Sequence, residues 1–171
     1  MPLSMYQASI PVLTRGLDVL STLLGKGAAH ADAGGHDRAT IVAARLAPDM
    51  LPLSGQIQRA SDTAKFAAAR LTGVDGPSFA DEEATLDDLQ ERCAKTIAYL
   101  ETVSLDAFAG SETRQITFGG GTSKTTLPGD AYLLHFALPN FFFHVTTAYD
   151  ILRHVGVPLS KLDYLGMPSR S

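Results

Sequence analysis

An apolar stripe repeating about every 3.5 residues runs through positions 46–71 and constrains the fold more than any other feature. Its members alternate between steps of four and three residues: Leu46, Met50, Leu53, Ile57, Ala60, Ala64, Ala67 and Leu71. This spacing favours left-handed, coiled-coil-like packing of helices, and the alanines allow a neighbour to approach closely. We therefore expect a long helix over 46–71 within a helical bundle, ended by Gly73 and Pro77.

A second helix is expected at the beginning of the chain, with Ser4 as its N-cap. Gly25 and Gly27 are the expected stops, and the composition of residues 27–38 predicts a mobile loop after them. The apolar stripe of this N-terminal helix consists of Ile10, Leu13, Leu17, Leu20 and Leu24.

Two further helices follow. Thr85 and Asp88 form a capping-box pattern at the start of one. The other is expected over 130–155, with Gly156 as its C-cap and Pro158 as a stop signal. The apolar stripe of the helix that starts after Thr85 consists of Leu86, Leu89, Cys93, Ile97 and Leu100.

Between these two helices, β-prone residues 114–118 and 123–127 flank a glycine turn at 119–121. This pattern predicts a small hairpin, which must pack on the bundle or on a partner because a lone hairpin is only marginally stable. The whole chain, 1–171, is thus expected to be one all-α domain, a four-helix bundle with a small β-hairpin insertion between helices 3 and 4.

Composition excludes several classes of protein. The 14 basic residues stand singly against 18 acidic ones, which disfavours a nucleic-acid binder. A single cysteine, Cys93, cannot form an internal disulfide and fits a cytoplasmic protein with a small buried hydrophobe at this position. Positions 1–6 lack a signal-peptide pattern, and the charged groups within 132–155 argue against a membrane helix.

The expected last helix carries polar groups in an otherwise apolar segment, residues 138–156. A buried polar group costs roughly 1–3 kcal/mol unless it finds a partner. The segment therefore needs either an internal hydrogen-bond network or a ligand. The candidate residues for this network or pocket are Gln56, His135, Asn140, His144, Tyr149 and His154.

Two interpretations of this segment follow from the residues themselves. The polar groups can form a structural network that closes the bundle. Alternatively, they are the anchors of a small-molecule pocket whose apolar walls include the phenylalanines at 141–143 and Tyr149. Three adjacent phenylalanines cannot all face one direction, so a second apolar contact surface is expected, which predicts a homodimer.

Several strings resemble the signature of an uncharacterised bacterial protein family related to the DinB-like superfamily of four-helix bundles, which includes the YfiT and bacillithiol-transferase branch. The resemblance spans nearly the whole chain and implies a DinB-like bundle and frequent homodimers. The strings are Pro139-Asn140-Phe141-x-Phe143-His144, Tyr149-x-Ile151-Leu152-Arg153-His154-x-Gly156-Val157-Pro158, Ser4-x-Tyr6-Gln7 and Lys161-x-Asp163-Tyr164-Leu165-Gly166.

The resemblance also implies a divalent metal, which better-known relatives hold with one histidine of the second helix and two histidines spaced four apart on the last. Here Asn140 and Ala148 stand four residues either side of His144, and 46–71 contains no histidine. One hypothesis is therefore a bundle protein with no assignable reaction. The alternative is a Zn-, Ni- or Mn-dependent hydrolase or thiol transferase with an altered ligand set: His144 with Asn140, His135, and Gln56 or Asp49.

Overall fold

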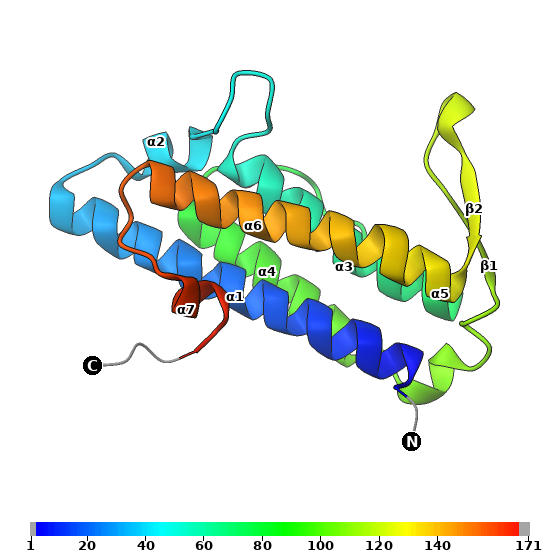
Figure 1. Ribbon diagram of the computed structural model, residues 1–171. Helices are drawn as coiled ribbons and strands as arrows, with labels where there is room; N and C mark the ends of the chain where they lie inside the picture. The colour runs from blue at the N-terminus through cyan, green and yellow to red at the C-terminus, as the bar shows by residue number, and fades with distance from the viewer. Residues whose placement is uncertain (1–2, 168–171) are drawn as a thin grey trace.

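A computed structural model describes residues 3–167 of the chain. Four long rods lie side by side and form an all-α bundle, as expected (Figure 1). The last rod is continuous but changes its helical type twice along its length. The rods are α1 (Met5–Gly34), α3 (Leu53–Thr72), α4 (Leu86–Glu101) and the succession α5 (Gly129–Tyr132), η3 (Leu133–Ala137) and α6 (Leu138–His154).

Short elements connect and flank the rods. The strands pair in antiparallel fashion, with Ile116 opposite Leu127, which confirms the expected hairpin. It stands at one end of the bundle, and the Phe118 ring lies 4.3 Å from the ring centre of Phe136. These elements are α2 (Arg38–Ala43), η1 (Leu105–Phe108), β1 (Gln115–Phe118), η2 (Gly121–Ser123), β2 (Thr125–Pro128) and α7 (Lys161–Tyr164).

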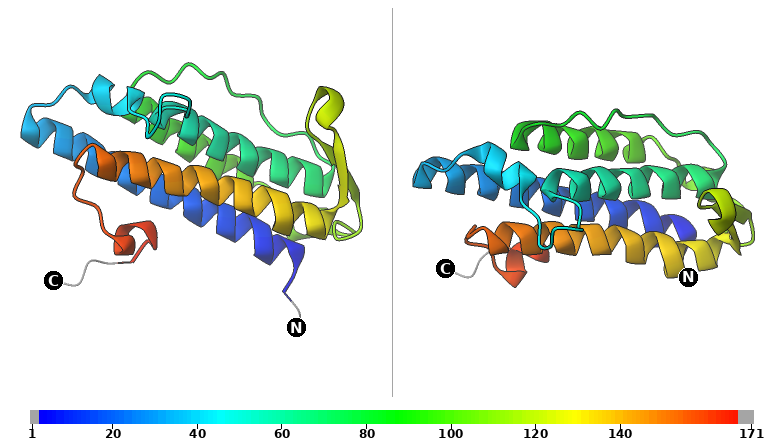
Figure 2. Two further views of the ribbon diagram at one scale, coloured as in Figure 1. Left: turned by 45° about the horizontal axis from the view of Figure 1, so that its top comes forward. Right: turned by 90° about the horizontal axis from the view of Figure 1, so that it is seen from above.

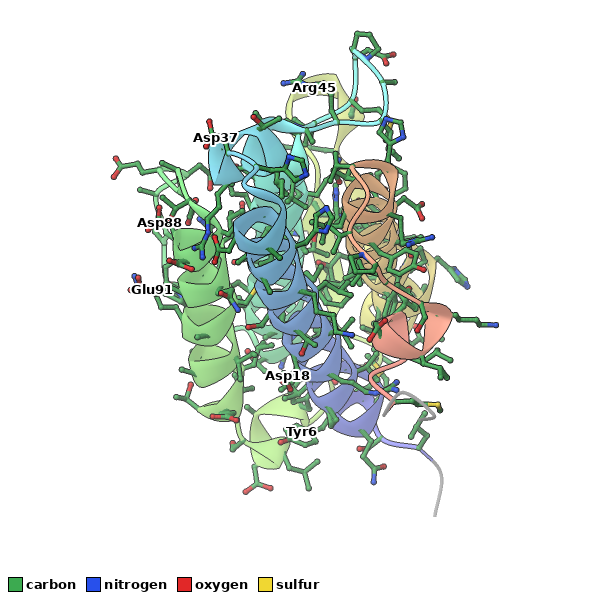
Figure 3. The ribbon with its side chains drawn as sticks, turned by 90° about the vertical axis from the view of Figure 1, so that its left-hand side faces the viewer. Tyr6, Asp18, Asp37, Arg45, Asp88 and Glu91 are labelled. Carbon is green, nitrogen blue, oxygen red and sulfur yellow. The ribbon has the colours of Figure 1, made fainter. Side chains whose placement is uncertain are left out.

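The core lies between the four rods. The predicted stripe of α1 is buried, as are Ala60, Ala64 and Ala67 of α3. Two views show how closely α3 runs beside the last rod (Figure 2). Polar side chains such as Glu91 project outward from the bundle (Figure 3). Within the described residues, no helix is both long and apolar enough to cross a membrane.

The helix starts predicted at Ser4 and Thr85 are confirmed. Ser4 Oγ accepts from the backbone N–H of Gln7, whose side chain accepts from the Ser4 N–H in return. Thr85 and Asp88 form the same reciprocal pair at the start of α4. At the other end of α3, Gly73 adopts a φ of 75°, a left-handed conformation suited to glycine.

The expected stop at Gly25 and Gly27 is wrong, because α1 continues to Gly34. Gly27 is buried, and a Cβ placed there would lie 3.1 Å from Leu152 Cδ2. The missing side chain therefore lets α6 approach α1 instead of ending the helix. The loop predicted over 27–38 is consequently mostly helical.

The expected helix over 46–71 begins too early. The helix α3 starts at Leu53, so Leu46 and Met50 lie outside it, and Leu46 is 40% exposed. Prolines at 48 and 52 explain the difference, since a proline disfavours the helical conformation of the residue before it. The periodic spacing at 46 and 50 therefore has no structural counterpart.

Candidate functional site

Gln56 on α3 and His144 on α6 form a hydrogen bond between the two helices. The distance from His144 Nδ1 to Gln56 Oε1 is 2.8 Å. Gln56 Nε2 donates to the Leu51 carbonyl at 3.1 Å, so the amide oxygen faces the imidazole and accepts from its Nδ1–H. The other ring nitrogen, Nε2, is then unprotonated. It has no partner within residues 3–167 and reaches solvent.

Burial lowers the pKa of His144 to about 4, and the positive charge of Arg59 acts in the same direction. The imidazole is therefore neutral near pH 7. A neutral ring with an exposed Nε2 lone pair accepts hydrogen bonds well. It is a weak general base, because an efficient base has a pKa near the working pH.

Asn140 lies one turn before His144 and makes a separate connection to α3. Its Nδ2 donates to Thr63 Oγ1 at 2.8 Å, and that hydroxyl donates to the Arg59 carbonyl at 2.7 Å. Asn140 and His144 thus each bind α3 and do not bind one another. Two polar pairs, spaced about two helical turns apart on α3, join it to the last rod.

A cleft of about 200 Å³ opens beside Asn140, between α3, the hairpin and the last rod. Arg70 Nη1 donates to the Tyr132 hydroxyl at 3.1 Å, and its guanidinium carbon lies 5.0 Å from the ring centre of Phe66. The cleft therefore combines aromatic walls with cationic side chains. It is lined by Arg59, Asp62, Thr63, Phe66, Arg70, Phe118, Gly119, Tyr132, Phe136 and Asn140.

The π-helical turn η3 helps to place three of these residues. Pro139 has no backbone N–H, so the helix cannot form the usual bond back to the carbonyl of His135. The chain widens into a π turn immediately before it. A π turn contains more residues than an α-helical turn, so positions four residues apart lie closer to the same side of the helix. Tyr132, Phe136 and Asn140, spaced four apart, all face the cleft.

The other candidate residues lie elsewhere. Tyr149 packs edge-on against Tyr164 of α7, with ring centres 5.8 Å apart, and His135 and His154 are exposed. The structure brings Gln56, Asn140 and His144 to one helix interface and leaves the remaining three outside it. The adjacent phenylalanines diverge as expected: Phe141 is fully buried, Phe142 is half-buried and Phe143 is 55% exposed.

Comparison with known proteins settles the family. Residues 5–165 match the model of a domain of unknown function, DUF1993. This chain is a member of the DUF1993 family. A crystal structure described as a DinB family member protein from Shewanella denitrificans is 38% identical, with a TM-score of 0.90, and the match covers 98% of this chain and 95% of that one. None of the curated proteins matches the chain. The DinB-like bundle expected from the sequence is confirmed, and no reaction is assigned to it.

The DUF1993 side chains around His144 do not fit the three-histidine metal site of the wider superfamily. Among the described residues, no three histidine, cysteine or acidic side chains converge closely enough to hold a metal ion. His144 bonds to the Gln56 amide and lies within the electrostatic influence of the Arg59 guanidinium, and Asp49 is exposed. One strong ligand beside a cation is a poor setting for a divalent metal.

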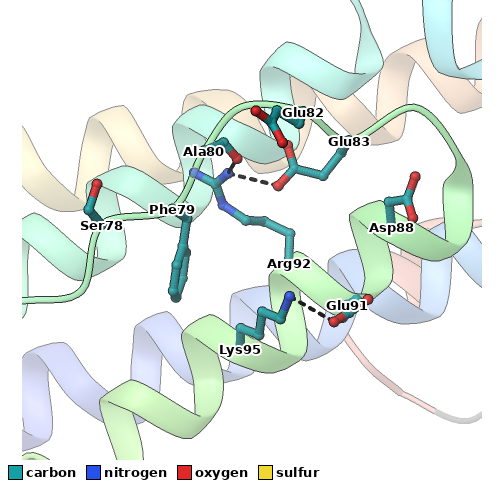
Figure 4. Close-up of a pocket in the computed structure, with 9 residues that line it drawn as sticks. All are labelled: Ser78, Phe79, Ala80, Glu82, Glu83, Asp88, Glu91, Arg92 and Lys95. Carbon is teal, nitrogen blue, oxygen red and sulfur yellow. Dashed lines mark hydrogen bonds and ion pairs between the residues drawn. The ribbon is translucent and has the colours of Figure 1, made fainter.

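A second polar cluster in this DUF1993 protein was not predicted. The Arg92 side chain of α4 is 1% exposed and binds three carboxylates, Asp62 at 2.9 Å, Asp81 at 3.1 Å and Glu83 at 2.8 Å. It also donates to Ser61 Oγ at 2.9 Å and to the Ala80 carbonyl at 3.0 Å. Figure 4 shows the guanidinium beneath the segment that carries Ala80 and Glu83.

The Arg92 cluster fastens the connection between α3 and α4 to the bundle. Burial acts to raise the pKa of Glu83, but hydrogen bonds from Gln58 and Arg92 hold it below its ordinary value. Lys65 joins the cluster through Asp62 at 3.0 Å. A sequence signal does exist, because Arg92 lies three residues after Leu89 at the edge of the apolar stripe and follows the acidic run 81–83. The same pattern also fits an exposed arginine.

Proposed function

We propose that this protein binds a small planar organic anion in the cleft between α3, the hairpin and the last rod. The observation that carries the proposal is the presence of Arg59 and Arg70 in one cleft with the aromatic rings of Phe66, Phe118 and Tyr132. Aromatic faces bind planar apolar rings, and arginine binds carboxylates through a fork of parallel N–H donors. The proposal is one of binding and includes no reaction.

The charge around the cleft favours an anion. Its lining and the ion-pair network behind it contain four cationic side chains and three carboxylates. The carboxylates of Asp62, Asp81 and Glu83 already accept from the buried Arg92. The Arg59 side chain is 50% exposed, and its ion pairs with Asp62 and Asp81 are both long at 3.4 Å. Long ion pairs made by a half-exposed arginine contribute little, so Arg59 can turn toward a ligand.

The size of the cleft limits the ligand. A volume of about 200 Å³ lies below the range of roughly 300–1,000 Å³ that is usual for drug-sized molecules. A single aromatic ring with one carboxylate is a suitable size. Asn140 supplies a side-chain oxygen that accepts no hydrogen bond from residues 3–167, and this oxygen suits a hydroxyl donor on the ring.

Titration with benzoate and benzamide, followed by ¹H–¹⁵N NMR, tests the proposal. The two molecules have similar shapes and differ in charge. We expect saturable shifts at cleft residues with benzoate and at least about tenfold weaker binding of benzamide, because a charge-assisted bond is lost. Arg59→Gln should remove this difference between the ligands.

Arg45→Gln is the matched control. Arg45 is also an exposed arginine, but its guanidinium bonds only to the backbone carbonyls of Pro48 and Met50. This variant should bind benzoate as the wild type does. Equal binding of benzoate and benzamide, or an Arg59→Gln variant that still discriminates between them, would contradict the proposal.

The homodimer remains a prediction. Phe66 and Phe143 are 47% and 55% exposed, on α3 and α6 respectively, and provide apolar surface that a partner copy would cover. Sedimentation velocity of the wild type and of Phe143→Ser measures this directly. We expect the substitution to shift the protein toward the monomer.

A further inference from the structure

A second hollow lies on another side of the bundle, between α1, α6 and α7. Its volume is about 370 Å³, within the range of roughly 300–1,000 Å³ usual for small-molecule sites. Arg15 is the one charged residue in its lining. The hollow, called the α7 groove below, is lined by Pro11, Val12, Arg15, Gly16, Val19, Phe142, Val145, Tyr164 and Leu165.

The α7 groove has a floor that depends on a glycine. Gly16 of α1 is buried against the ring of Phe141, and a Cβ at this position would come within 2.3 Å of Phe141 Cε1. The absence of a side chain lets the Phe141 ring pack into the core directly behind the groove. The walls on either side are apolar and include Val12 and Val19 from α1 and Val145 from α6, together with the rings of Phe142 and Tyr164.

The C-terminal segment forms the roof of the α7 groove and is fixed at several points. Arg15 donates through Nη2 to the Leu165 carbonyl, and Lys26 pairs with Asp163. The Tyr164 hydroxyl lies 3.0 Å from Thr146 Oγ1 on α6. Because the roof is bonded to both α1 and α6, the shape of the groove is fixed by the fold.

Arg15 is placed to recognise an anion at the mouth of the α7 groove. Within residues 3–167, no carboxylate lies within 4.0 Å of its guanidinium. One N–H bonds to a backbone carbonyl, which leaves further donors of the guanidinium free. Asp18 and Asp163 line an adjoining hollow on which Arg15 also borders, and Lys26 neutralises Asp163.

We infer that the α7 groove binds a medium-chain aliphatic carboxylate, with the alkyl chain against the valines and the carboxylate paired with Arg15. An apolar lining with one cationic anchor matches the two halves of such a molecule. The groove shares no lining residue with the cleft beside Asn140, so the inference does not depend on the function proposed above. The two sites also differ in composition, since the lining of the α7 groove contains three valines and that of the cleft beside Asn140 contains none.

Calorimetric titration with butyrate, hexanoate and octanoate measures the contribution of the chain. Each buried CH₂ should tighten binding about fourfold, and each step of two carbons about fifteenfold. Octylamine has the same chain and the opposite charge, so it should bind at least about tenfold more weakly than octanoate. Arg15→Gln should remove the preference for octanoate, and Val12→Phe should weaken all chains by filling the groove.

Arg153→Gln is the matched control for Arg15→Gln. Arg153 is an exposed arginine that also donates to a backbone carbonyl, that of Val157 at 3.1 Å, but it lies outside the lining of the groove. This variant should bind octanoate like the wild type. Circular dichroism checks that each variant is folded. The chain-length series uses the wild type and therefore still tests the inference if Val12→Phe fails to fold.

Four outcomes would overturn the inference. Affinity that does not rise with chain length would mean that the groove does not bury the alkyl chain. Octylamine binding as well as octanoate, or Arg15→Gln binding unchanged, would mean that Arg15 is not the anchor. If octanoate fails to bind at millimolar concentration and Val12→Phe instead changes the sedimentation coefficient, the groove is a contact between copies of this chain.

Discussion

His144 and Gln56 are 88 positions apart in the chain, and a hydrogen bond of 2.8 Å joins their side chains across α3 and α6. The bond requires a proton on Nδ1, which the neutral Nδ1–H tautomer and the charged imidazolium both carry. Burial and the charge of Arg59 lower the pKa of His144 to about 4, which keeps the ring neutral near pH 7. Acid acts against this interface because protonation of Nε2 would place a positive charge in a largely buried position near Arg59.

Stability should depend on pH through His144. Its pKa is about 4 in the folded protein and about 6.5 in an unfolded chain, so the unfolded state binds more protons between these values. The free energy of unfolding should fall as pH falls from about 6.5 to 4, by up to about 1.4 kcal/mol per pH unit. Urea unfolding at several pH values measures this slope, and His144→Gln should make it shallower.

His135→Gln is the control for this experiment, because it makes the same substitution at an exposed histidine two turns earlier. It should leave the slope as in the wild type. If His144→Gln and the wild type lose stability in parallel between pH 6.5 and 4, protonation of His144 is not the cause.

Arg92→Met should destabilise the protein by about 3–5 kcal/mol, because it removes the buried cation that three carboxylates share. Chemical denaturation measures the loss. Lys95→Met on the same helix is the comparison, since its ion pair with Glu91 is exposed and should be worth less than about 1 kcal/mol. Similar losses for the two variants would refute a structural role for the Arg92 cluster.

Gly16→Ala should lower stability by about 1–3 kcal/mol, although alanine has the better helix propensity by about 1 kcal/mol. The added methyl would meet the Phe141 ring at 2.3 Å. Combining it with Phe141→Leu should restore part of the loss beyond simple additivity, which a double-mutant cycle detects. Gly120→Ala, with open space around it, should change little.

Cys93 should not react with a thiol reagent in the native protein. The side chain is fully buried, and burial raises its pKa to about 12, so almost no thiolate exists at neutral pH. Labelling with Ellman's reagent should follow the global unfolding transition in urea. Rapid labelling in buffer alone would show that α4 opens locally.

Local sequence cues predicted the helix boundaries well wherever the deciding contacts span a few residues. The caps at Ser4 and Thr85 bond to residues three positions away, and Gly73 ends α3 through its own backbone conformation. Gly27 misled the prediction because its role is a contact with Leu152, far along the chain. A glycine that admits a neighbouring helix has the same local signature as one that ends a helix.

The candidate site was predictable in part. Polar residues in an apolar segment pointed to Asn140 and His144, and both do bond across the helix interface. The partner of Asn140, Thr63, could not be identified, since threonine is common on helix faces. Arg92 was missed for a related reason: its burial depends on three carboxylates that converge only in the folded chain.

The start of α3 has a consequence for the order of folding. Its N-cap, Pro52, makes no side-chain bond, and the Leu53 N–H instead donates to the Ala44 carbonyl. The helices α1 and α4 start with self-contained caps, so we expect them to form early and α3 to become stable only on docking. During synthesis Gln56 and Thr63 cannot form their bonds to His144 and Asn140 until residues 140–144 have left the ribosome. The cleft beside Asn140 is then among the last parts of the bundle to form.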